Sequence, residues 1–85
     1  MDLVDQIEKI STRDDFIRFL NLLIEDYEKN NEEWENNNLS LYLKALANYT
    51  NSIDANYMHR KINEDANVAT WRRFADILMG ATVYE

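Results

Sequence analysis

The chain is organised around the stretch W-E-N-N-N-L-S-L-Y-L, residues 34–43. This stretch places a large aromatic side chain, Trp34, at the end of an acidic run. Three asparagines follow, and asparagine is a preferred helix-capping residue. Apolar residues then recur at helical spacing. The stretch therefore predicts a corner with Trp34 wedged between the two longest helices. Of the three candidate caps for the helix after the corner, Asn36, Asn37 and Asn38, we favour Asn36.

The segment before the corner has the strongest helical pattern in the chain. Its apolar residues step by three and four, which predicts a helix from about Thr12 to Asn30. Ser11 with Asp14, or equally Thr12 with Asp15, fits a capping box at its start. Ion pairs at a spacing of four are expected for Asp14 with Arg18 and Glu25 with Lys29. The expected apolar stripe consists of Phe16, Ile17, Phe19, Leu20, Leu23, Ile24 and Tyr27.

The remaining segments also follow helical periodicity. A short helix is predicted over Leu3–Ile10, and the helix after the corner is expected to stop where Asn51 and Ser52 interrupt the pattern. A shorter helix is predicted over Ile53–Ile62, and Asn67 is the expected cap of the last helix. The buried face after the corner is expected to hold Leu39, Tyr42, Leu43, Leu46 and Tyr49 or Thr50. The last helix is expected to bury Val68, Trp71, Phe74, Ala75, Leu78, Ala81 and Tyr84.

Two further features of the last helix make specific predictions. Gly80 lies in its apolar half, where glycine costs roughly 1 kcal/mol relative to alanine. A close approach by a neighbouring helix would explain that glycine. Asp76 follows Arg72 by four residues and Arg73 by three, so ion pairs on the exposed side are expected.

The composition favours an all-α fold. Residues 1–85 are short enough to form one domain, and proline is absent while glycine occurs once. A β-rich fold needs such turn residues in quantity. We therefore predict a single-domain small helical bundle of four to five helices.

The charge distribution restricts the partners. Residues 1–42 hold eleven carboxylates against four Lys or Arg, a net charge of −7, whereas residues 43–85 hold five of each. Binding to a nucleic-acid backbone or to an anionic membrane surface needs a basic surface, so neither is expected. An acidic patch instead attracts a basic protein. Carboxylates on a solvated helix face can also simply keep the chain soluble.

The side chains that usually carry out catalysis are scarce. The chain has no cysteine, and one glycine cannot form a phosphate-binding loop. His59 is the only histidine, and it lacks the spacing of a carboxylate-bridged metal motif because Asn56 stands three residues before it. Adjacent carboxylates such as Glu32 and Glu33 diverge on a helix. We predict no enzyme activity, no metal and no cofactor. The N-terminal residues have no signal-peptide pattern, so a cytoplasmic protein is expected.

The tryptophans can serve either a core or a binding face. Aromatic residues at helical spacing are usually buried, so both Trp34 and Trp71 are expected in the core. An exposed Trp34 within an acidic rim would instead suit a binding hot spot for a basic partner. The predicted partner-binding residues are Glu25, Asp26, Glu28, Glu32, Glu33, Trp34 and Glu35.

The chain resembles a family of small bacterial helical proteins of unknown function over roughly residues 10–85. The distinctive elements are the Trp34-Glu35-Asn36 triplet and the terminal Tyr84-Glu85 pair, supported by the start at Ser11 and Asp14. Members often carry a tryptophan near the position of Tyr49, and this chain departs there. The resemblance implies a bacterial helical domain and supplies no catalytic residue.

Two functions are compatible with these features. The first is a small acidic interaction module, of the kind found in immunity proteins or antitoxins, that covers a basic site with the 25–35 region. The alternative is a homo-oligomeric structural or scaffold domain, because broad apolar faces can be covered by self-association.

Overall fold

The computed structural model describes residues 3–84, apart from the side chain of Val4. These residues form four α-helices, a single 3-10 turn and no strand. The all-α prediction is confirmed, with four helices in one small domain. The elements are α1 (Leu3–Ile7), α2 (Arg13–Asn30), η1 (Asn31–Glu33), α3 (Leu39–His59) and α4 (Trp71–Gly80).

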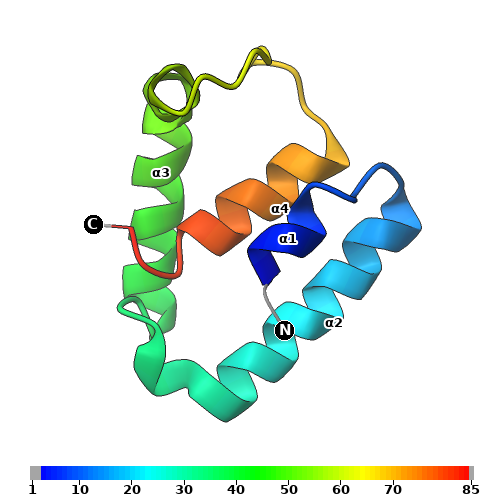
Figure 1. The fold of residues 1–85 in the computed structure, drawn as a ribbon. Helices are drawn as coiled ribbons and strands as arrows, with labels where there is room; N and C mark the ends of the chain where they lie inside the picture. Colours follow the sequence, from blue (N-terminus) through cyan, green and yellow to red (C-terminus); the bar gives the residue numbers. More distant parts are fainter. Residues whose placement is uncertain (1–2, 85) are drawn as a thin grey trace.

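The last helix occupies the centre of the fold. The long helices α2 and α3 diverge from the corner that joins them, and α4 lies between them and packs against both (Figure 1). The short α1 covers α2 and α4 from one side. In this arrangement, the ten residues of α4 pack against all three of the other helices.

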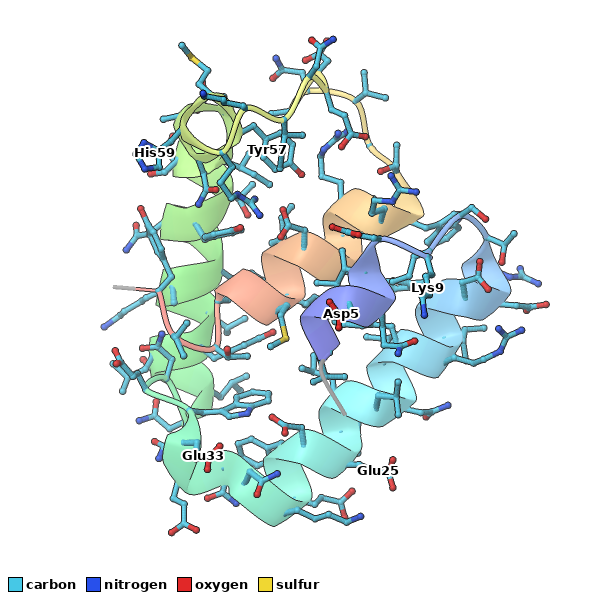
Figure 2. All side chains as sticks on the ribbon, in the orientation of Figure 1. Asp5, Lys9, Glu25, Glu33, Tyr57 and His59 are labelled. Carbon is cyan, nitrogen blue, oxygen red and sulfur yellow. The ribbon has the colours of Figure 1, made fainter. Side chains whose placement is uncertain are left out.

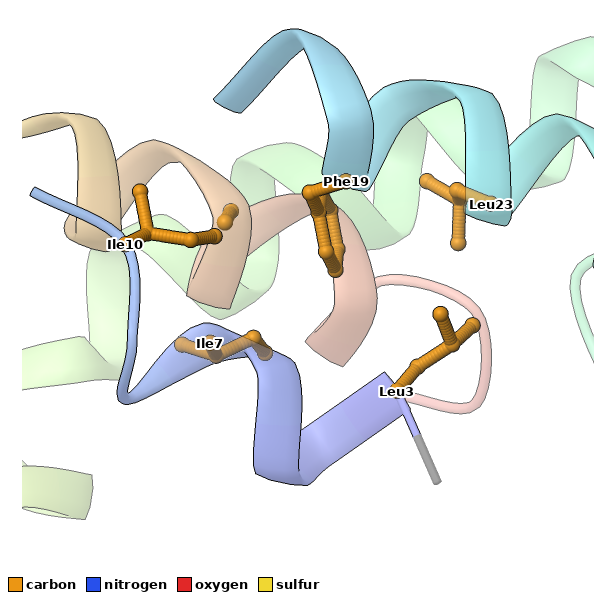
Figure 3. Close-up of a cluster of buried hydrophobic side chains, with 6 residues drawn as sticks. Leu3, Ile7, Ile10, Phe19 and Leu23 are labelled. Carbon is orange, nitrogen blue, oxygen red and sulfur yellow. The ribbon is translucent and has the colours of Figure 1, made fainter. Parts of the chain in front are cut away.

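Two apolar clusters form the core. The first joins α1, α2 and α4 around Phe19, which is 1% exposed, and Ala75, which is fully buried (Figure 3). Leu3, Ile7, Ile10 and Leu23 complete it. The second cluster joins α3 to α4 and the C-terminal residues. Its buried members are Tyr49, Ile53 and Tyr57, with Ile77 and Tyr84 packed against them.

The predicted interruption at Asn51 and Ser52 is wrong, because α3 runs unbroken through them. The buried positions of α3 are Ala45, Tyr49, Ile53 and Tyr57, which recur every four residues. That spacing keeps one face of a helix on the core on both sides of the polar pair. The predicted Ile53–Ile62 helix is therefore the second half of α3, and it ends at His59.

The start of α2 agrees with one of the two predicted capping boxes. The Thr12 hydroxyl accepts a hydrogen bond from the Asp15 backbone N–H at 3.1 Å, and the Asp15 carboxylate accepts one from the Thr12 N–H at 3.2 Å. Arg18 pairs with Asp15 at 3.1 Å instead of the predicted Asp14. The predicted pair of Glu25 and Lys29 is present at 3.7 Å.

The N-terminal helix and the start of the last helix differ from prediction. Helix α1 ends at Ile7, although Ile10 remains buried at 3% exposure. Helix α4 is capped by Thr70, whose hydroxyl accepts from the Arg73 N–H at 3.0 Å. The predicted cap, Asn67, instead donates to the Asp65 side chain, which forms a local turn.

Two members of the predicted buried stripe also lie elsewhere. Val68 is 52% exposed and precedes α4. Tyr84 follows the helix, and its ring meets that of Tyr49 edge-on at 5.3 Å. Trp71 begins α4 and is 38% exposed, so the prediction that it is a core residue is wrong.

The close approach expected at Gly80 is confirmed. A methyl group built on Gly80 would lie 2.5 Å from Cζ of Tyr49. The aromatic ring of α3 therefore rests directly on the backbone at the end of α4, which only glycine permits without movement.

Candidate protein-binding surface

The predicted acidic residues gather where α2 turns into η1. Glu25 and Glu28 lie on α2, Glu32 and Glu33 on η1, and Glu35 just beyond, and all five are exposed. Figure 2 shows Glu25 and Glu33 near this junction. Lys29 pairs with Glu25 at 3.7 Å and neutralises only part of the charge. We call these five carboxylates the acidic corner.

The other two predicted partner-binding residues serve the fold. The Trp34 indole N–H donates to the Asp26 carboxylate at 2.7 Å, and Asp26 also accepts from the Asn30 amide at 3.3 Å. Both Trp34 and Asp26 are half-buried. These contacts hold the corner together, and the role of Trp34 and Asp26 in binding a partner stays a prediction.

Trp34 does lie between the two longest helices, as predicted. Its ring meets Tyr27 of α2 edge-on at 5.0 Å and stacks on Tyr42 of α3 at 5.9 Å. The predicted cap is wrong, however, because Asn38 caps α3: its side chain accepts from the Leu41 N–H at 2.9 Å.

Asn36 instead fastens the C-terminal residues to the corner. Its side-chain amide donates to the backbone carbonyls of Ala81 at 2.9 Å and Tyr84 at 2.7 Å. Its own backbone N–H donates to the carbonyl of Thr82 at 3.0 Å. Three hydrogen bonds from one residue therefore connect the corner to the turn after α4. These bonds hold the backbone of the acidic corner in place.

An apolar pocket of about 220 Å³ lies beside the acidic corner. Tyr27, Trp34, Leu39 and Tyr42 line it together with the three asparagines 36–38. Tyr27 is 39% exposed and Leu39 is 73% exposed, although both were predicted to be buried. The sequence offered one signal for this surface. The apolar stripes on both helices are wider than the face that one neighbouring helix can cover.

Comparison with known protein families adds one finding. The model for DUF7660, a family of unknown function, matches residues 12–85. The chain belongs to this family. The expected resemblance to a family of unknown function is thereby confirmed over nearly the whole chain. Searches of curated proteins and of solved structures found no match.

This DUF7660 domain has a second polar cluster, built around Asp76 of α4. Its carboxylate accepts hydrogen bonds from the hydroxyls of Tyr49 at 3.3 Å and Tyr57 at 3.1 Å, and it pairs with Arg60 at 3.4 Å. The predicted exposed pairs of Asp76 with Arg72 and Arg73 are therefore wrong.

Arg72 and Arg73 bond other groups instead of Asp76. Arg73 is only 5% exposed, and its guanidinium donates to the Tyr57 hydroxyl and to the Val68 carbonyl and faces Glu64 at 3.8 Å. Arg72 donates to the carbonyl of Ile10 at 3.3 Å. These bonds connect the 60–70 segment, and the segment between α1 and α2, to α4. The cluster is a structural network whose donors and acceptors are mutually paired.

Burial raises the pKa of three tyrosines in this DUF7660 domain, Tyr42, Tyr49 and Tyr57. Loss of water raises the pKa of Tyr42 to about 12. Burial, reinforced by the negative charge of Asp76, raises the pKa of Tyr49 to about 12. Both hydroxyls remain neutral hydrogen-bond donors at physiological pH, and Tyr42 uses its proton to bond the carbonyl of Leu78 at 2.8 Å.

The remaining candidate groups give no site. His59 is exposed at the last residue of α3. Among residues 3–84, no three histidine or carboxylate side chains are close enough together to hold a metal ion. Within the same residues, no helix has the length and apolarity needed to cross a bilayer.

Proposed function

We propose that this domain is a non-catalytic protein-interaction module whose acidic corner binds a basic protein. The observation that carries the proposal is the placement of five exposed carboxylates beside an exposed apolar pocket. Charged residues around an apolar patch are the usual composition of a protein-binding surface. One form of this function is an immunity or antitoxin-like role, in which the corner covers a basic functional site of the partner.

The electrostatics support a fast, salt-sensitive encounter. The net charge of −7 is carried by residues 1–42, which contain α1, α2 and the acidic corner. A concentrated field of one sign raises the association rate of an oppositely charged protein, and dissolved salt weakens it. The backbone of the acidic corner is held in place by the hydrogen bonds of Asn36 and by the hydrogen bond from Trp34 to Asp26. Binding therefore needs little ordering of the domain itself.

The test is capture of partners from the source cells on the immobilised domain. Proteins that bind through the corner should be retained at low salt and lost at about 0.5 M NaCl. The Glu32→Lys plus Glu33→Lys variant should lose them as well. The matched control, Asp5→Lys plus Asp54→Lys, changes the net charge equally at exposed sites away from the corner and should retain them.

The alternative function is a homo-oligomeric scaffold. Leu39, Leu43 and Ile24 are 73%, 52% and 54% exposed, and self-association would bury such side chains. Sedimentation of the domain at high micromolar concentration distinguishes the two functions. A monomer agrees with the interaction module, whereas a concentration-dependent dimer favours the scaffold. Failure of the charge-reversal variant to lose any salt-sensitive partner would rule out the role proposed for the acidic corner.

A further inference from the structure

Exposed apolar side chains recur on three helices of this domain. On α2, Ile17 and Ile24 are 46% and 54% exposed, and Tyr27 is 39% exposed. On α4, Trp71 and Phe74 are 38% and 41% exposed. On α3, Leu39 and Leu43 are 73% and 52% exposed. The half-buried Leu20, Leu78 and Leu46 continue the three stripes.

Each stripe follows one side of its helix. The α2 residues are separated by three, four and three positions, those of α4 by three and four, and those of α3 by four and three. Residues at these spacings line one face of an α-helix. The stripes are therefore surfaces, and the exposed side chains are not scattered over the molecule.

On α2 and α4, the stripes lie on the side away from α1. Helix α1 packs on Phe19 and Leu23 from one side (Figure 3). Leu22 lies on that side, because it lines a cavity together with Gln6 of α1. A rotation of about 100° per residue places Leu20 and Ile24 on the opposite flank of α2 from Leu22. On α4, Arg72 donates to the carbonyl of Ile10, which follows α1, and the same rotation places Phe74 on the other flank.

Direct contacts join the three stripes. Phe16 of α2 packs on Trp71 at 5.5 Å and on Phe74 at 6.3 Å, which connects α2 to α4. Tyr42 of α3 donates to the carbonyl of Leu78 on α4. Trp34, which contacts Tyr27 and Tyr42, closes the corner end. These contacts bring the three stripes near one another, and we call the apolar surface that the stripes form the apolar trough.

We propose that the apolar trough docks an amphipathic helix of the partner, with basic side chains on that helix crossing the acidic corner. This inference rests on the proposed function and names the element that the partner contributes. Apolar residues at helical spacing in the partner would enter between the stripes, as in other helix-in-groove complexes. The domain measures 34 × 28 × 18 Å, and a helix of about 18 residues is about 27 Å long, so such a helix spans the trough.

The charges favour a basic partner over a second copy of this chain. Glu28 and Glu35 of the acidic corner are the sequence neighbours of Tyr27 and Trp34, which lie at the corner end of the trough. A second copy would bring its own net charge of −7 toward them. Like charges placed together weaken association, whereas lysine or arginine on the docked helix would pair with the corner.

A synthetic peptide of about 18 residues tests the proposal, with leucine at positions i, i+3, i+4 and i+7 and lysine elsewhere. A scrambled peptide of the same composition is the control. Trp71 lines the trough and Trp34 closes its end, so tryptophan fluorescence reports binding directly. We expect the helical peptide to bind at least about tenfold more tightly than the scrambled one. Equal affinity of the two peptides would overturn the proposal.

Variants then locate the binding. Ile24→Glu plus Phe74→Glu places charges in the trough, and we expect it to weaken binding by about tenfold or more. The control is Met58→Glu plus Val83→Glu, which adds the same charge at two apolar residues, 81% and 54% exposed, outside the trough. Circular dichroism confirms that both variants fold. An equal loss in the control variant would show that binding is not located in the trough.

The same titration separates this proposal from the proposed function. If Glu32→Lys plus Glu33→Lys weakens peptide binding and the trough variant does not, the acidic corner stands and the trough is refuted. If only the trough variant weakens binding, the trough docks a helix and the role of the acidic corner is refuted. If the unliganded domain sediments as a dimer that the trough variant dissociates, the occupant is a second copy and the proposed partner helix is overturned.

Discussion

At the scale of single residues, Gly80 sets the distance between α3 and α4. Three atoms of the Tyr49 ring, Cζ, Cε1 and Cε2, lie within 2.7 Å of the position that a Cβ atom on Gly80 would take. The ring therefore covers the glycine face-on, and it cannot swing aside freely because its hydroxyl bonds Asp76 at 3.3 Å. The missing side chain is what lets α3 and α4 approach.

We expect Gly80→Ala to lower the free energy of unfolding by about 1–3 kcal/mol, as overpacking of a core does. Alanine forms helices better than glycine by about 1 kcal/mol, so the steric clash must exceed that gain. Urea denaturation followed by circular dichroism measures the change. In a Tyr49→Leu background the smaller side chain leaves room, and the penalty should shrink. An alanine variant as stable as the parent would show that the ring moves at little cost.

Asn36 makes a contact of a different kind. Its side-chain amide bonds the carbonyls of Ala81 and Tyr84, which lie 45 and 48 positions further along the sequence. Asn36→Asp keeps the shape but removes both amide donors and sets a carboxylate against the carbonyls of Ala81 and Tyr84. We expect a loss of about 1–3 kcal/mol in the free energy of unfolding. Amide hydrogen exchange of the 81–84 turn should accelerate as well.

Asn37→Asp is the matched control for this substitution. Its side chain lies one position further along the corner, and Asn37 contributes its backbone carbonyl to a bond from Tyr27 at 2.9 Å. The control adds the same negative charge to the acidic corner and leaves that backbone bond in place. Equal losses in the two variants would attribute the effect to charge and not to the lost donors.

At the scale of helices, α2 was the most predictable element. Its cap at Thr12, one of two equal candidates, and its end at Asn30 follow from local rules and agree with the structure. Of its predicted apolar stripe, Phe19 and Leu23 are buried, whereas Ile17, Ile24 and Tyr27 are exposed. Helix α3 was predicted in two pieces because Asn51 and Ser52 favour turns. Core contacts at Tyr49 and Ile53 on either side outweigh that local preference.

The corner shows why local rules chose the wrong cap. Three consecutive asparagines have the same intrinsic capping preference. The choice between them depends on Asn36 meeting the carbonyls of Ala81 and Tyr84, which are distant in sequence. Once Asn36 is used there, Asn38 is left to cap α3. Only knowledge of the tertiary fold could have separated the three residues.

The candidate surface was predictable only in part. The exposed carboxylates follow from the density of charge between Glu25 and Glu35. Periodicity gives the width of an apolar stripe, but it does not say which part of the stripe a neighbour covers. The exposure of Ile24 and Phe74 depends on α1 packing on one side of α2 and α4, which the sequence pattern does not specify.

The cap of α3 gives a prediction at this scale. We expect Asn38→Ala to lower the free energy of unfolding by about 1 kcal/mol, because the Leu41 N–H loses its acceptor. Asn38→Asp retains an acceptor oxygen at the helix N-terminus and should remain close to the parent in stability. Urea denaturation of the two variants side by side checks the cap. A destabilised aspartate variant with an unaffected alanine variant would contradict it.

At the scale of the whole molecule, α4 unites two clusters that otherwise have little in common. Its Ala75 belongs to the cluster with α1 and α2, while its Ile77 packs on the cluster with α3. Tyr42 and Tyr49 both reach α4 from α3, one to the Leu78 carbonyl and the other to Asp76. The attachment of α3 therefore depends on tyrosine hydroxyls that must keep their protons.

This dependence predicts that the folded domain loses stability in alkaline solution. Tyr42 and Tyr49 have pKa values raised from 10.0 to about 12 in the folded state. Below pH 10 both states keep these protons, so the stabilisation is fully present. As the pH rises from 10 toward 12, the unfolded chain releases protons that the folded chain retains, and the free energy of unfolding falls. Urea denaturation in steps from neutral pH to about pH 12 should show this decline.

Tyr42→Phe identifies the contribution of one hydroxyl. The variant should be less stable at neutral pH by about 1 kcal/mol, because the Leu78 carbonyl loses its donor. Its stability should then fall less steeply above pH 10, because phenylalanine has no proton to release. Absorbance of tyrosinate at each pH shows independently when the hydroxyls ionise. A parent and variant with parallel declines would mean that Tyr42 titrates alike in both states, and its burial would not account for the alkaline transition.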